Sequence, residues 1–179
     1  MKIAILQIDK IEPDVLEYVR DNIAKVFPKT EIVILNQKLS LSREAYDSAR
    51  EQYDSGLLRM FIREFTEKTS GDRVLGITNV DLFVPQLNFV FGEAESPGKA
   101  AIVSLNRLRP EFYGGQPQKA LFLERATKEA THETGHMLGL PHCPDSSCVM
   151  SFSNTIHAVD RKKTEFCQKC ALQLSKIVG

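Results

Sequence analysis

The chain has 179 residues, a length that suits one domain. Its 23 basic and 23 acidic residues give a net charge of zero, which offers no electrostatic support for binding a nucleic acid or a membrane surface. Hydrophobic residues make up 42% of the chain, which is enough for a core. No apolar run reaches the ~18 residues of a membrane-spanning helix.

The first half of the chain predicts alternating strands and helices. Apolar periodicity and turn residues predict a strand over 2–8, a helix from 13 to about 27, a strand over 30–36, a long helix from 42 to about 68 and a strand over 73–78. Pro13 fits the first turn of its helix, and Ser42 can cap the long one. A bend in the long helix is expected at Gly56.

The second half predicts two short strands and two helices. Pro85 interrupts an apolar run, so we expect a short edge strand over 88–91. A turn at 96–98 precedes a strand over 100–105, and helices are expected over 118–138 and 171–178. The order of elements indicates an α+β fold with a mixed twisted sheet and helices behind it.

Residues 132–142 read HETGHMLGLPH, which is the pattern H-E-x-x-H-x-x-G-x-x-H. On a helix, positions i and i+4 project from nearly the same face, so His132 and His136 can converge on one ion at about 2.0–2.1 Å. Glu133 is rotated from His132 by about 100°, which places its carboxylate beside the ion rather than on it. These three positions therefore predict two metal ligands and an adjacent general base.

The rest of the motif predicts a third ligand. Gly139 can take the left-handed conformation that ends a helix, and Pro141 prevents the helix from continuing, so the chain can bring His142 back to the ion. Zinc held by three imidazoles keeps a fourth position for water and lowers the pKa of that water from 15.7 toward ~7. Glu133 is the expected base for that water and the later donor to the leaving amine.

All four cysteines lie beyond this helix: Cys143, Cys148, Cys167 and Cys170. The second pair forms a C-x-x-C knuckle and the first is spaced C-x₄-C, so the four thiolates can complete a tetrahedral structural zinc site. Two disulfides, buried free thiols or a redox pair are the alternatives; we favour zinc, because no secretory signal is evident. Because Cys143 follows His142 directly, we expect the cysteine site to anchor the loop that carries the third histidine.

Together these motifs resemble the archaemetzincin branch of the metzincin metallopeptidases. The resemblance covers residues 132–170, about a fifth of the chain, and one spacing departs from it: sixteen residues rather than seventeen separate Met150 from the second cysteine pair. It implies a zincin-like fold, peptidase activity and two zinc ions, one catalytic and one structural. It also implies that Met150 forms a turn beneath the three histidines.

Weaker candidates lie outside the motif. His157, Arg107, Arg109 and Tyr113 are candidate contacts to the substrate or its oxyanion, although an exposed polar loop is the more frequent explanation for such residues. The segment 88–93 is a possible edge strand for pairing with a peptide backbone.

We therefore expect a zinc-dependent metallopeptidase that acts on a peptide or protein. The alternative is a zinc-containing protein that binds a peptide or partner on the same scaffold with little turnover. A zinc knuckle for nucleic acid is weaker, given the zero net charge. We expect one metzincin-like catalytic domain, with an N-terminal lobe over 1–139 and a C-terminal lobe over 140–179 stapled by the cysteine zinc. We also expect a cytoplasmic monomer that binds no nucleic acid or membrane.

Overall fold

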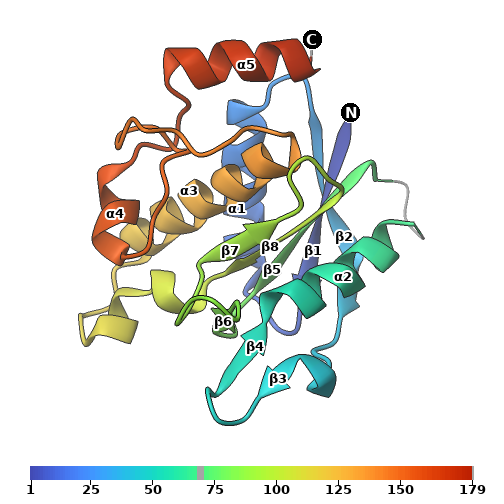
Figure 1. Cartoon of the computed structure of the whole chain (residues 1–179), viewed down its shortest axis with the longest axis vertical. Coiled ribbons are helices and arrows are strands. Elements are labelled where there is room, and N and C mark those ends of the chain that lie inside the picture. Colours follow the sequence, from blue (N-terminus) through green and yellow to red (C-terminus); the bar gives the residue numbers. More distant parts are fainter. Residues whose placement is uncertain (68–70, 179) are drawn as a thin grey trace.

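The computed structural model describes residues 1–67 and 71–178 and contains two sheets (Figure 1). The large sheet has the strand order β2-β1-β5-β8-β7 and the small sheet has the order β3-β4-β6. The strands are β1 (Lys2–Ile8), β2 (Glu31–Leu39), β3 (Tyr46–Asp47), β4 (Gln52–Asp54), β5 (Arg73–Thr78), β6 (Leu82–Phe83), β7 (Gly92–Ala94) and β8 (Ala100–Ser104). The α-helices are α1 (Pro13–Val26), α2 (Ser55–Thr66), α3 (Lys119–Met137), α4 (Ile156–Arg161) and α5 (Gln168–Val178), and the 3-10 helices are η1 (Arg43–Ala45), η2 (Asn106–Leu108) and η3 (Pro110–Tyr113).

The large sheet is mixed, as the sequence predicts. Strands β2, β1, β5 and β8 run parallel, whereas β7 is antiparallel to β8 and forms one edge of the sheet. The predicted strands 2–8 and 73–78 coincide with β1 and β5. The central strands β1 and β8 are mostly apolar because they are buried on both faces.

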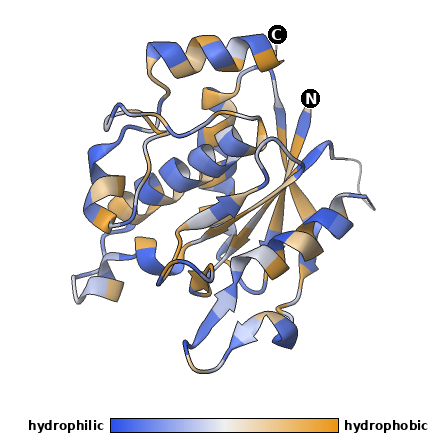
Figure 2. Ribbon diagram, viewed as in Figure 1, coloured by the Kyte–Doolittle hydropathy of each residue, from blue (hydrophilic) through white to orange (hydrophobic). Residues whose placement is uncertain are grey.

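Helices cover both faces of this sheet rather than one. Ile3 and Ile5 of β1 face a core shared with α1 and α3, while Ala4 and Leu6 face a second core shared with α2. Figure 2 shows the hydrophobic strands between these helices. Helix α3 contributes Leu123, Ala126, Ala130 and Met137 to the first of these cores, and all four are buried. Within the described residues, no helix is long and apolar enough to cross a membrane.

The predicted long helix over 42–68 is wrong in its first half. Residues 43–54 instead form η1 and the β3–β4 hairpin, and α2 begins at Ser55. Asp47 explains the difference, because its carboxylate accepts hydrogen bonds from the backbone N–H groups of Ala49 and Arg50 and closes a turn. Asp54 then caps α2 through Leu57 N. Ser42 caps η1, and position 68 lies outside the described residues.

The predicted edge strand over 88–91 is also displaced. Within that stretch Val90 makes only an isolated bridge to Leu82, and the ladder with β8 begins at Gly92. The C-terminal helix begins at Gln168, three residues earlier than predicted, so it includes Cys170. Helix α4 was not predicted, because six residues carry too little periodicity to be recognised.

Candidate metal centre

Helix α3 ends at the histidine motif, and the turn after it returns the chain to the same place. Gly139 has a φ of +94°, in the left-handed region that the sequence predicted, and Leu140 N donates to Gly135 O across the turn. The ring centroids of His136 and His142 are 4.6 Å apart, and those of His132 and His136 are 4.5 Å apart. One ligand nitrogen from each ring lies within 4.8 Å of the others.

Backbone carbonyls set the tautomers of the two helical histidines. The Nδ1–H of His132 donates to Val149 O and the Nδ1–H of His136 donates to Leu140 O, each at 2.8 Å. Both Nε2 atoms therefore present lone pairs, and these two atoms lie only 3.0 Å apart. Two facing lone pairs repel each other unless a cation lies between them, so the donor set fits a metal ion.

The donor types and spacings suit zinc. Tetrahedral zinc with bonds of 2.0–2.1 Å places two nitrogen ligands about 3.4 Å apart, close to the observed separation. Burial lowers the pKa of His132 well below its usual value, lowers that of His136 to about 4 and lowers that of His142. Neutral imidazole is the form that binds a metal, so the rings are ready to do so at neutral pH.

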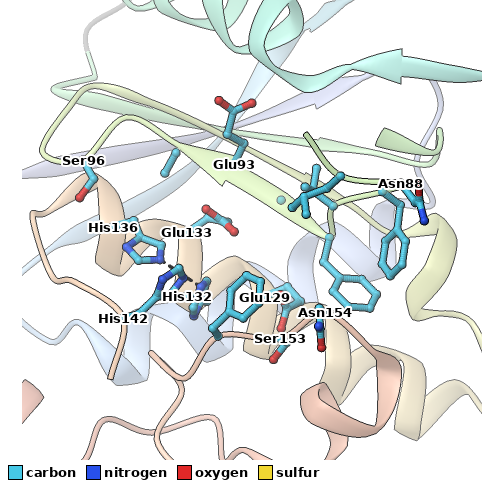
Figure 3. Close-up of a pocket in the computed structure, with 17 residues that line it drawn as sticks. Asn88, Glu93, Ser96, Glu129, His132, Glu133, His136, His142, Ser153 and Asn154 are labelled. Carbon is cyan, nitrogen blue, oxygen red and sulfur yellow. Dashed lines mark hydrogen bonds between the residues drawn. The ribbon is translucent and has the colours of Figure 1, made fainter. Parts of the chain in front are cut away.

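Glu133 lies beside the histidines on the side of strand β7 (Figure 3). Its side chain is buried, and this burial raises its pKa well above the usual carboxyl value. The nearby charges of Glu129 and Glu93 raise the pKa further, and Lys162 opposes them. A carboxyl group with a raised pKa is suited both to accept a proton and to return it near neutral pH.

Strand β7 approaches α3 so closely that only glycine fits at position 92. A Cβ atom there would lie 2.7 Å from Glu133 Cγ and 2.7 Å from the backbone oxygen of Ile102. Gly92→Ala should therefore lower the free energy of unfolding by about 1–3 kcal/mol, because the added Cβ clashes with Glu133 and with the backbone of β8. Thermal unfolding measures this effect. An alanine variant as stable as wild type would show that the neighbouring atoms move aside at little cost.

Met150 packs against helix α3 at the level of the histidines. It is fully buried, and its Sδ atom is so close to Gly135 that a Cβ on that glycine would lie 2.5 Å away. Gly135 immediately precedes His136, so the methionine contacts the helix next to one of the histidines. The backbone oxygen of Met150 also accepts a hydrogen bond from Cys143 N.

The four cysteines form a second cluster, with all Sγ atoms within 4.8 Å of one another and no disulfide among them. Cys143 Sγ and Cys167 Sγ are 3.8 Å apart, the separation of about 3.8 Å that two thiolates take on a tetrahedral zinc with bonds of 2.3 Å. A backbone N–H of Cys170 lowers the pKa of Cys167 to about 7, toward the thiolate form that binds metal. The geometry favours a metal site over the disulfide alternative.

A cavity of about 470 Å³ opens onto the histidines (Figure 3). Residues 87–94, which include β7, line one side of it, and α3 supplies Glu129, Glu133 and two histidines. Phe152, Ser153 and Asn154, which follow Met150, line the opposite side. The cavity is therefore a cleft with an edge strand along one wall and the motif at its base.

Among the weaker sequence candidates, the segment 88–93 lines this cleft, whereas the four single residues do not. Arg107 forms an ion pair with Asp81, and Tyr113 donates to Arg107 O. Arg109 pairs with Glu12, and His157 is exposed on α4. Sequence reasoning also missed Glu129, although its position four residues before Glu133 on a helix could have indicated it. No sequence signal indicated Phe152 or Asn154.

This sheet, the motif helix and the cleft define a class: the protein is a zinc metallopeptidase, a hydrolase of peptide bonds. The profile of Peptidase family M54 matches residues 2–176. The chain belongs to this family, whose members include the archaemetzincins, and the resemblance and the α+β fold class are confirmed. The alternative of a protein that only binds its partner is not favoured.

Similar proteins cover nearly the whole chain. An archaemetzincin of Methanocaldococcus jannaschii is 44% identical over 97% of this chain and 93% of its own length, and one of Pyrococcus abyssi is 40% identical over 97% and 94%. The crystal structure of archaemetzincin from Methanopyrus kandleri superposes with a TM-score of 0.88 at 38% identity, covering 99% of this chain and 95% of that one. A zinc-dependent peptidase from Methanocorpusculum labreanum gives a TM-score of 0.84 at 29% identity, covering 96% and 99%.

Proposed function

We propose that His132, His136 and His142 bind the catalytic zinc and that Glu133 is the general base for peptide hydrolysis. The observation that carries this proposal is that the Nε2 atoms of His132 and His136 face each other at 3.0 Å, in the same cleft as the Glu133 carboxylate. Gly139 supports the site because its left-handed backbone returns His142 to the other two rings.

Each residue has a separate task in this scheme. The zinc supplies Lewis acidity, which lowers the pKa of a water and polarises a carbonyl group. The Glu133 carboxylate accepts a proton from the attacking water, holds it in a site protected from bulk solvent, and donates it to the nitrogen of the leaving amine. The carbonyls of Val149 and Leu140 fix the imidazole rings, so the ligands need no reorientation during turnover.

The substrate that fits this cleft is an extended peptide segment. Strand β7 ends the large sheet, so its outer edge can pair with a peptide backbone. Residues 87–91 continue the same wall of the cleft. A peptide laid along this wall passes over Glu133 and the histidines, which places one of its carbonyl groups near the motif.

Digestion of a mixed-sequence peptide library tests this function. We expect new amino termini in the presence of zinc, loss of the products when a chelator is added, and their return when zinc is restored. A library that stays intact with fully zinc-loaded protein would contradict the proposal. The cleaved sequences would also define the side-chain preference.

We further propose that Cys143, Cys148, Cys167 and Cys170 bind a structural zinc and that Met150 supports the catalytic site from below. The two lobes are then residues 1–139 and 140–179, and the second zinc cross-links the smaller lobe. The free thiols agree with the predicted cytoplasmic location. We keep the prediction of a monomer that acts without nucleic acid or membrane.

Metal analysis should find two zinc ions per chain, one labile and one resistant to a mild chelator. His142 is exposed and the histidines open onto the cleft, whereas three of the four cysteines are buried. The ion at the histidines should therefore exchange first. Atomic emission after stepwise chelation measures both ions, and His142→Ala is the matched control that should lose the labile ion alone. One zinc per fully loaded chain would contradict the proposed second site.

A further inference from the structure

Lys162 is a lysine with no exposed surface, and it lies immediately after helix α4. Its Nζ forms an ion pair with Glu129 Oε1 at 2.7 Å, and the side chain of Glu129 is only 3% exposed. The same Nζ donates to the backbone oxygen of Ser151 at 3.4 Å. A buried charge of this kind is costly to fold, and a pair of apolar residues often replaces such an ion pair at no loss of stability.

The two partners of Lys162 belong to the two segments that frame the metal centre. Glu129 lies on α3, one helical turn before Glu133, and lines the cleft. Ser151 follows Met150, which packs against α3 at Gly135. A single ammonium group therefore joins the helix that carries the base to the turn that lies beneath the histidines.

The side chain of Lys162 has no exposed surface. It therefore acts on the metal centre through its contacts to Glu129 and Ser151 and does not touch a substrate.

We propose that Lys162 is a positioning residue for the catalytic site. It holds the Glu129 carboxylate of α3 and the Ser151 carbonyl of the Met150 turn together, and so fixes the base and the histidines relative to one another. This inference rests on the zinc site proposed above. Glu133 remains the proposed base, and the three histidines remain the proposed zinc ligands.

A neighbouring ion pair provides the matched control. Arg125 Nε and Nη2 contact the two carboxylate oxygens of Asp160 at 2.7 and 2.8 Å and also join α3 to the α4 segment. This pair lies one turn farther from the histidines than Glu129 does, and neither residue lines the cleft. Asp160→Asn should therefore lower the melting temperature while kcat and the metal site stay unchanged.

Lys162→Met should behave differently from this control. We expect kcat to fall about 10- to 100-fold and zinc to dissociate faster by a similar factor, as for other residues that orient metal ligands. KM should change by less than about threefold, because the cleft wall is intact. The visible absorption spectrum of the cobalt-substituted protein should shift, because the ligands are less well held.

The double variant Glu129→Met/Lys162→Met separates positioning from simple stabilisation. It leaves no buried charge unpaired, so it should fold even if the single variant does not. It lacks the link to Ser151, so low kcat and fast zinc loss should persist. Wild-type kcat, zinc dissociation and cobalt spectrum in the folded double variant would overturn the proposal. If wild type cleaves no peptide, the zinc and cobalt measurements still decide whether Lys162 positions the site.

Discussion

Glu133→Gln should abolish most peptide hydrolysis while the protein keeps its fold and its zinc. Glutamine has nearly the same shape as glutamate but cannot accept the proton, so kcat should fall by about 10²–10⁴-fold, the range for loss of a general acid–base group. KM should change little, because the cleft wall formed by residues 87–94 is untouched. Steady-state hydrolysis of a peptide selected from the library measures both constants.

Glu124→Gln is the matched control for this variant. Glu124 lies on the same helix, is half exposed, pairs with the buried Lys128 and does not line the cleft. The same chemical change there should leave kcat unaltered. Zinc content must be equal in both variants and wild type for the comparison to hold. Equal product from Glu133→Gln and wild type would remove Glu133 from the mechanism.

The sequence predicted that the three histidines lie together, because these residues are close to one another along the chain. Helical spacing brings His132 and His136 together, and Gly139 ends the helix so that His142 can return. These are local rules of backbone geometry, so they hold whatever surrounds them. The central strands were predicted for a similar reason, since burial on both faces requires a continuous apolar run.

Other features depend on contacts between distant segments, and a single sequence does not reveal them. The apolar stripe after Ser42 suggested a helix, but Asp47 closes a turn and Tyr46 pairs with Tyr53 across the β3–β4 hairpin. The start of β7 at Gly92 is set by its close approach to α3 and β8. The Glu129–Lys162 ion pair joins residues 33 positions apart, so no local spacing in the sequence predicts it.

Cys170→Ser should release the zinc proposed at the cysteines and weaken zinc binding at the histidines. Serine is a poor zinc ligand, and losing a structural metal is among the few changes that lower the free energy of unfolding by more than about 4 kcal/mol. For a chain of this size, the melting temperature should then fall by at least about 8 °C. Zinc should also leave the histidine site faster, because Cys143 follows His142 directly and its N–H donates to Met150 O.

Ser175→Ala provides the control on the same helix. Ser175 is exposed on α5 and its hydroxyl donates to Leu172 O three residues earlier on the same helix, so its loss should alter neither zinc content nor stability measurably. The decisive quantity is the rate at which zinc leaves the histidines, measured with a chromophoric chelator at a temperature where both variants are folded. If Cys170→Ser loses its second zinc but holds the first as firmly as wild type, the loop after His142 is stabilised by its own packing. The two metal sites would then be neighbours without being coupled.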